Sequence, residues 1–227
     1  MPIFNIWPEI ILGLSLRSDG SMKNNFVGQN NFLKNLGLGS RIVAQADLIH
    51  QNQAVAVDNI TNNLIIKNCD AIVSSQSNIL LSLTVADCLP IYFYDSKQGV
   101  IGLAHAGWRG LIAGVIDQTL KIFFEKYNSS PNDIKVFIGP HIQSCHFEVQ
   151  KDIINFFDSR FILKRENRFW VDLSQLAQSK LIEAELLDNN IQISSECTYC
   201  LSDKYFSYRR EKSTGLKTML AFISFKL

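Results

Sequence analysis

The sequence predicts a mixed α/β (α+β) protein, in which helices pack on a mixed β-sheet within one layered domain. Short apolar segments typical of strands alternate with segments of helical periodicity, and two strands lie close enough in sequence to form an antiparallel hairpin. No repeat, low-complexity tract or linker divides the 227 residues. We therefore expect residues 1–227 to form a single domain.

The expected elements follow one another at short intervals. Residues 18–39 are rich in glycine, asparagine, serine and lysine, which predicts a surface loop with one short helix. Apolar residues at three- and four-residue spacing predict a helix over 110–127. Helices are also expected over 152–157 and 173–188, and strands over 40–48, 54–57, 71–74, 80–86, 91–95, 100–104, 134–138, 191–193 and 219–225.

Composition limits the classes of partner. The formal net charge is +1, without an acidic block or polybasic tail, so no basic field favours nucleic acid or an anionic membrane. The N-terminus lacks the features of a signal peptide, and no apolar run reaches the roughly 18 residues of a membrane span. These features predict a soluble, cytoplasmic protein whose partners are small molecules, and they leave its oligomeric state open.

The five cysteines indicate metal binding or catalysis rather than a disulfide framework. Their number is odd, and no secretion signal precedes them, so we expect reduced thiols. The five are Cys69, Cys88, Cys145, Cys197 and Cys200.

Cys88 and His105 stand at equal distances from the predicted turn, whose centre falls between Ser96 and Lys97. Residues equidistant from a hairpin turn face each other across an antiparallel pair, so we expect the thiol and the imidazole to meet. Such a pair forms either an activated nucleophile or two ligands of a soft metal ion. The alternative is a buried cysteine beside a histidine that hydrogen-bonds to the backbone.

Two arginine-containing segments are candidates for binding an anion. Arg109 lies in a glycine-rich segment between a strand and a helix, where free N–H groups and a guanidinium suit phosphate; the alternative is a tight turn with a solvated arginine. Arg209 and Arg210 are adjacent in FSYRR. If that segment is extended, only one of them enters a pocket, and we favour Arg209, with Arg210 solvated or paired with Glu211.

Other candidate ligands are weaker. His50 is a possible third metal ligand, although a lone histidine in a loop is more often simply exposed. Cys197 and Cys200 form a CxxC pair, but no second CxxC completes a four-cysteine site, so a structural role is favoured. Cys145 and His146 would point to opposite faces of an extended segment and make a poor catalytic pair.

Several strings in the chain resemble those of one known family. TVADCLPIYFYD, GLAHAGWRG, IGPHIQSCHFEV, CT and FSYRRE-x-x-TG occur in order, and the match extends from about residue 12 to residue 225. They are similar to the YfiH/LACC1 family, known both as the multicopper polyphenol oxidase (laccase) domain family and as the purine nucleoside phosphorylase YfiH/LACC1 family. The resemblance implies one α/β domain with a cysteine-hydrolase-like fold.

The resemblance also implies a metal site and an activity. Its ligands fall on His50, Cys88 and His105, with zinc as the expected metal and copper as the alternative. The implied reactions are phosphorolysis of adenosine, inosine, guanosine and methylthioadenosine, a transferase activity, and hydrolytic deamination of adenosine, a hydrolase activity. A link of bacterial relatives to cell-wall precursor editing leaves a Cys–His amide hydrolase open, and a non-catalytic metal-binding protein is the third alternative.

On this interpretation three further residues assist the reaction. Arg109 and Arg209 would hold the phosphate, and Asp87 would carry a proton or orient a ligand. A multinuclear copper oxidase is disfavoured because the chain has only four histidines.

The chain departs from the family pattern at three places. The glycine that usually follows the first ligand is missing after His50, and Leu216, followed by Lys217, replaces an arginine. The 18–39 region is shorter than usual, which is expected to alter the pocket wall.

Overall fold

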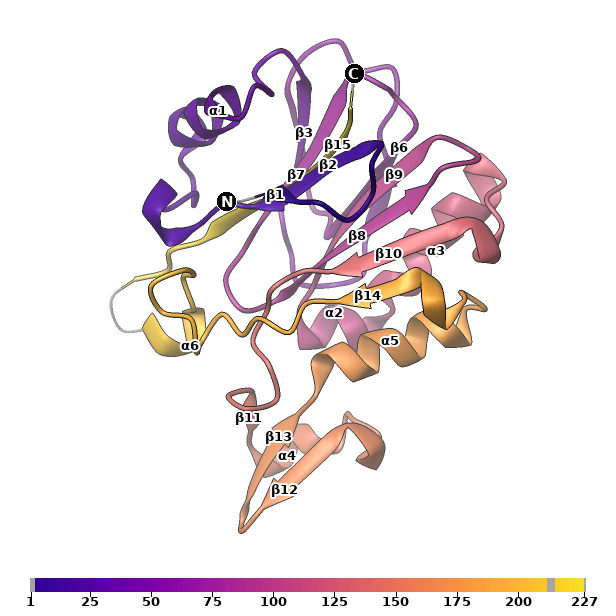
Figure 1. Cartoon of the computed structure of the whole chain (residues 1–227). Coiled ribbons are helices and arrows are strands. Elements are labelled where there is room, and N and C mark those ends of the chain that lie inside the picture. Colours follow the sequence, from indigo (N-terminus) through magenta and orange to yellow (C-terminus); the bar gives the residue numbers. More distant parts are fainter. Residues whose placement is uncertain (1–2, 212–214, 227) are drawn as a thin grey trace.

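Two six-stranded sheets and one three-stranded sheet make up the β structure of the computed structural model, which describes residues 3–211 and 215–226 (Figure 1). The first sheet has the order β1 (Ile3–Phe4), β2 (Ile10–Leu14), β15 (Met219–Phe225), β7 (Ile79–Val85), β3 (Ile42–Ala46) and β5 (Leu64–Ile66). The second has the order β14 (Ile191–Ile193), β10 (Ile134–Ile138), β8 (Leu89–Asp95), β9 (Val100–Ala106), β6 (Ala71–Ser74) and β4 (Ala54–Ala56). Both sheets contain parallel and antiparallel pairs, as the sequence predicts.

Helices cover the outer faces of the two large sheets. The small third sheet, β11 (Glu148–Val149), β13 (Arg168–Val171) and β12 (Ile162–Arg165), projects away from them together with one short helix (Figure 1). The helices are α1 (Phe26–Asn35), α2 (Trp108–Ala113), α3 (Val115–Tyr127), α4 (Lys151–Ile154), α5 (Leu173–Glu183) and α6 (Tyr208–Glu211). Short 3₁₀ helices span Arg17–Asp19, Pro131–Asp133, Ser159–Phe161 and Asp188–Asn190.

Alternating strand residues build the layers, because successive side chains of a strand point to opposite faces. Leu80 of β7 packs with α1, whereas its neighbour Leu81 packs between the two large sheets. Tyr92 of β8 also lies between the sheets, whereas Phe93 packs with residues of α3. The resulting order of layers is α1, first sheet, second sheet, and then α2, α3 and α5.

Most of the predicted elements are present within a residue or two, and the differences have local causes. The helix expected over 110–127 begins earlier, at Trp108, and is split because Gly114 adopts a left-handed conformation with φ of 90°. The segment expected to be extended around Arg209 is instead the helix α6. The strands β1, β2, β5, β11, β12 and β13 were not predicted, and α5 ends at Glu183 instead of at residue 188.

The hairpin of β8 and β9 forms, but its predicted register is wrong. His105 pairs with Pro90 rather than with Cys88, and the same register places Cys88 just beyond the strand end, opposite Gly107. The thiol therefore reaches the imidazole from the loop that precedes β8, and not from across a paired strand.

The turn explains the shift of register. Asp95 pairs with Val100, so the turn is centred between Lys97 and Gln98, one residue later than predicted. The Asp95 carboxylate accepts hydrogen bonds from the backbone N–H groups of Lys97 and Gln98 at 2.8 and 3.1 Å, and Gly99 has φ of 62°. A buried aspartate and a left-handed glycine thus fix a four-residue turn.

No helix within the described residues is long and apolar enough to cross a membrane.

Asp58 ties the end of α3 to the end of β6. Its carboxylate accepts hydrogen bonds from Lys126 and Tyr127, both at 2.7 Å, and from the hydroxyl of Ser74 and the N–H of Ser75 at 3.1 and 3.0 Å. Burial alone would raise the pKa of Asp58, but these bonds outweigh burial and lower it to about 2. The ionised form is therefore stabilised in the folded state.

We predict that Asp58→Ala lowers the free energy of unfolding by about 1–2 kcal/mol at pH 7, after discounting for partial exposure. Because the folded pKa lies below the unfolded value, this contribution is present above about pH 4 and is lost as the pH falls toward about 2. Urea denaturation at several pH values measures it. Glu125→Ala, at an exposed ion pair, is the control and should change stability by less than about 0.5 kcal/mol; an equal loss in both variants contradicts the prediction.

Candidate functional site

A pocket of about 880 Å³ opens where chain segments leave the two large sheets. His50 follows β3, Cys88 lies between β7 of the first sheet and β8 of the second, and His105 is near the end of β9. All three side chains line this pocket. The structure therefore brings these three residues to one pocket from three separate segments.

Asp70 lies behind the two histidines and is fully buried. Its Oδ1 accepts hydrogen bonds from the backbone N–H of His50 at 2.9 Å and from Nδ1 of His105 at 3.0 Å. Its Oδ2 accepts from the N–H of Gln51 at 2.8 Å. An ionised carboxylate can only accept, so the His105 Nδ1 carries the proton and Nε2 is left for a ligand.

These contacts set the charge of the site. Burial would lower the pKa of His105, but Cys88 and Asp70 outweigh burial and raise it to about 9. The pKa of Asp70 is lowered despite burial, chiefly by its bonds to His105 and Gln51. Partial burial lowers the pKa of His50, with further contributions from His105 and Arg109. A cation that binds His105 must therefore displace a proton.

Gly107 gives the thiol room beside the imidazole. A Cβ atom built on Gly107 would lie 3.0 Å from the Cys88 sulfur and 3.8 Å from Cε1 of His105. The rings of His50 and His105 meet edge to face, with centroids 4.7 Å apart. Gly110 has a related role, because a Cβ there would lie 2.8 Å from the carbonyl oxygen of Gln51, next to His50.

Two of the sequence-predicted site residues have strained backbones. His50 has φ of 60° and Asp87 has φ of 87°, both in the left-handed region that non-glycine residues rarely adopt. Strain of this kind persists where surrounding contacts impose it, and it is concentrated at functional sites. The hydrogen bond from the backbone N–H of His50 to the Asp70 carboxylate is one such contact.

Asp87 lines the pocket, but its carboxylate is fully engaged with neighbouring loops. It accepts hydrogen bonds from the hydroxyls of Thr198 at 2.6 Å and Ser207 at 3.0 Å, and from the backbone N–H of Arg209 at 2.7 Å. Asp87 therefore fixes the start of α6 and the position of Arg209 beside the pocket. Its role in proton transfer stays a prediction.

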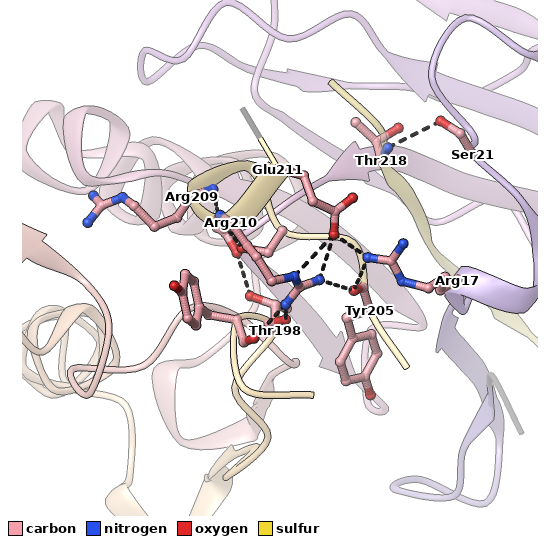
Figure 2. A network of polar contacts seen from close by, with 11 residues as sticks. Arg17, Ser21, Thr198, Tyr205, Arg209, Arg210, Glu211 and Thr218 are labelled. Carbon is pink, nitrogen blue, oxygen red and sulfur yellow. Dashed lines mark hydrogen bonds and ion pairs between the residues drawn. The ribbon is translucent and has the colours of Figure 1, made fainter. Parts of the chain in front are cut away.

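Arg209 and Arg210 lie in separate environments, although both are on the helix α6 and not on the extended segment that the sequence suggested. Arg209 lines the pocket, and its guanidinium donates to the carbonyl oxygens of His146 and Glu148 at 3.3 and 2.9 Å. Arg210 pairs with Glu211 at 2.7 Å and donates to nearby carbonyl oxygens. Figure 2 shows Arg209 extending away from the polar network around Arg210.

Arg109 is exposed at the pocket and lies over the ring of its neighbour Trp108, with the guanidinium carbon 4.2 Å from the ring centroid. Leu216, at the position where the resemblance implies an arginine, also lines the pocket. Its neighbour Lys217 instead lies with Nζ 5.9 Å from the centroid of the Phe206 ring. The apolar side chain of Leu216 thus faces the pocket at this position.

Asp70 is the site residue that sequence reasoning missed. One feature of the sequence could have identified it: Asp70 directly precedes a predicted buried strand, and a buried ionised group requires a partner. Nothing in the sequence identified that partner, because His105 lies 35 residues away.

The donors present fit the metal that the resemblance implies. Two imidazoles and a thiolate suit zinc or copper, and a carboxylate that holds a ligating histidine through its other nitrogen commonly accompanies zinc. Ligand atoms of His50, Asp70 and His105 lie within 4.8 Å of one another, and the Cys88 sulfur lies beside His105. The order thiol, imidazole, carboxylate also fits an activated nucleophile.

Comparisons with known proteins agree on one family. The family model described as multi-copper polyphenol oxidoreductase laccase matches residues 17–226. A purine nucleoside phosphorylase of Staphylococcus epidermidis is 35% identical over 195 residues, covering 82% of this chain and 70% of the relative. Purine nucleoside phosphorylase YfiH of Escherichia coli is 32% identical over 163 residues, covering 69% of this chain and 64% of the relative.

Purine nucleoside phosphorylase YlmD of Geobacillus stearothermophilus is 33% identical over 164 residues, covering 68% of this chain and 59% of its own length. For several of these relatives, the chain therefore spans less than two thirds of their length. Among solved structures, the hypothetical protein YfiH of Bacillus licheniformis matches with a TM-score of 0.86 and 23% identity, covering 99% of both chains. That likeness establishes the mixed α/β fold.

We predict that Asp70→Asn lowers the pKa of His105 by about one unit or more, because the neighbouring negative charge is lost. NMR titration of the imidazole in metal-free protein measures this change. Asp95→Asn is the matched control, since Asp95 is also fully buried but lies at the far end of the same hairpin. An unchanged His105 pKa in Asp70→Asn, or an equal shift in the control, contradicts the assigned role.

Proposed function

Because the chain belongs to the multi-copper polyphenol oxidoreductase laccase family, which is the YfiH/LACC1 family, we propose that it is a purine nucleoside phosphorylase. One observation carries the proposal: a single pocket is lined by two histidines, a thiol and two arginines. Candidate metal ligands thus stand beside cationic groups that suit a phosphate.

The proposed substrates are inorganic phosphate and a purine nucleoside, namely adenosine, inosine, guanosine or methylthioadenosine. A cavity of about 880 Å³ has the volume of pockets that hold small-molecule ligands. Its wall includes the apolar side chains of Ile142, Phe147 and Leu173, which would pack against a purine base. Phe26, from the short 18–39 region, completes the wall and is 50% exposed, so it would contact substrate at the rim.

In phosphorolysis a phosphate oxygen bonds to C1′ of the ribose while the bond from C1′ to the purine nitrogen breaks. We assign the phosphate to Arg109 and Arg209, whose planar guanidiniums match its oxygens. Holding both reactants in one pocket converts a two-body encounter into an internal reaction. Asp87 would position Arg209 through its backbone N–H, and proton transfer to the leaving purine is its alternative role.

We propose His50, Cys88 and His105 as the ligands of a zinc ion, with copper as the alternative metal. When bound, the ion supplies a Lewis acid to the pocket. Asp70 would keep the proton of His105 on Nδ1, so that Nε2 can bind the ion. It would also fix the position of His50 through the hydrogen bond to its backbone N–H. We further propose hydrolytic deamination of adenosine to inosine as a second activity of this pocket.

A multinuclear copper oxidase remains disfavoured. The chain has four histidines, and His141 is fully buried with its Nδ1 2.8 Å from the carbonyl oxygen of Gly139. A cluster of several copper ions needs more imidazoles than this pocket offers.

A cysteine hydrolase is the second candidate, and the Cys88, His105 and Asp70 relay favours it. In that reaction the Cys88 thiolate would add to an amide carbonyl, and the protonated His105, oriented by Asp70, would give its proton to the amine that leaves as the C–N bond breaks. Water would then hydrolyse the thioester and free the thiol. Activity would then survive removal of metal.

The boundaries of a single domain over residues 1–227 and the cytoplasmic location stay predictions.

We predict that purified protein with adenosine and phosphate forms adenine and ribose 1-phosphate, and that a chelator removes this activity. Cys88→Ala and His105→Ala should each lower kcat/KM at least about 100-fold, since each removes a group of the reacting site. Cys69→Ala, outside the pocket, is the matched control and should retain activity. Products are separated by liquid chromatography, and inosine reports deamination.

Two results would contradict the proposal. Nucleosides that remain intact while an amide substrate is cleaved would support the hydrolase. Full activity after chelation, abolished by alkylation of Cys88, would exclude the metal from the reaction.

A further inference from the structure

A second group of metal-ligating side chains lies outside the pocket lining. Cys145 and His146 follow β10, and Cys197 and Cys200 follow β14, so about fifty residues separate the two pairs. One ligand atom from each of the four lies within 4.8 Å of the other three. We call these residues the Cys₃His cluster. The sequence analysis did not group these four residues, because it considered only a second CxxC motif as the partner of Cys197 and Cys200.

The spacing of the ligand atoms matches a tetrahedral zinc site. The Cys145 sulfur lies 3.7 Å from the sulfurs of both Cys197 and Cys200. With zinc–sulfur bonds of about 2.3 Å, two ligands of a tetrahedron stand about 3.8 Å apart. Nδ1 of His146 lies 3.2 Å from the Cys145 sulfur and 3.3 Å from the Cys200 sulfur, close to the roughly 3.6 Å expected for a nitrogen and a sulfur ligand.

The surroundings hold these side chains in place. The imidazole of His146 stacks on the ring of Tyr199, with centroids 4.0 Å apart and planes 17° from parallel. The backbone N–H of Gln143 donates to the sulfur of Cys197 at 3.4 Å, a contact that stabilises a thiolate. Cys197 is buried, whereas Cys145 and Cys200 are exposed, so an ion can reach the cluster from solvent.

We propose that Cys145, His146, Cys197 and Cys200 bind a structural zinc ion, separate from the metal site of the pocket. Three thiolates and one imidazole form a closed set of four ligands, which is the usual composition of structural rather than catalytic zinc sites. The bound ion would form four bonds: three to the sulfur atoms, which lie close together, and one to the imidazole of His146.

The cluster would join two loops that support the pocket wall. Thr198, which follows Cys197, donates its N–H to the carbonyl oxygen of His141 at 3.0 Å and its hydroxyl to Asp87 at 2.6 Å. Arg209 donates to the carbonyl oxygen of His146 at 3.3 Å. Zinc at the cluster would therefore fix the positions of Asp87 and Arg209 without touching the substrate.

The test measures zinc bound to the full chain by mass spectrometry of the metal. Cys88→Ala removes a proposed ligand of the pocket, so this variant isolates the second ion and should retain about one zinc per chain. Adding Cys200→Ser should remove that ion, whereas adding Cys200→His, which restores a ligand, should retain it. Cys200 is exposed, so the serine variant is expected to fold. Ser202→Ala, at an exposed residue of the same loop that is outside the cluster, is the matched control and should retain the ion.

A second measurement uses cobalt in place of zinc. Cobalt–thiolate absorption in the Cys88→Ala protein should indicate several sulfur ligands and should weaken in the Cys200→Ser background. The proposal is overturned if Cys88→Ala binds no zinc, or if Cys200→Ser leaves the zinc content unchanged. It is also overturned if peptide mass mapping of freshly purified protein without reductant shows Cys145 in a disulfide with Cys197 or Cys200. None of these results depends on nucleoside activity, so failure of the proposed function leaves the test valid.

Discussion

The buried carboxylate of Asp70 is the constraint on which the candidate site depends. A fully buried ionised group needs several partners to offset its desolvation, and this one obtains them from His105 and from the backbone of His50 and Gln51. The same bonds fix the tautomer of one histidine and the strained loop of the other. The electrostatic requirement of one aspartate thus orders two candidate ligands at once.

The layered fold brings the third candidate ligand to this carboxylate. The chain leaves the first sheet at the end of β7 and enters the second at β8, and Cys88 lies in the short crossing between them. Gly107, opposite that crossing, has no side chain to separate the thiol from His105. The packing of two sheets face to face therefore sets the site as much as the identities of its residues do.

Local patterns in the sequence predicted the mixed α/β fold and placed Cys88 near His105. His50 was assigned to the same site only through the family resemblance. They could not predict the register of the hairpin, because it depends on how the Asp95 side chain closes the turn. They missed Asp70 because its partner lies far away in sequence. The spacing of apolar residues along the sequence predicts helices and strands. It does not predict interactions that form only in the folded chain, such as the stacking of the two sheets.

The most direct measurement is anomalous X-ray diffraction at the zinc absorption edge, from crystals of the protein grown with zinc. The account predicts an anomalous peak in the pocket within bonding distance of His50, Cys88 and His105, with Asp70 hydrogen-bonded to His105 and not to the ion. A pocket without a peak, or a peak whose ligands omit Cys88 and one of the histidines, would contradict the account.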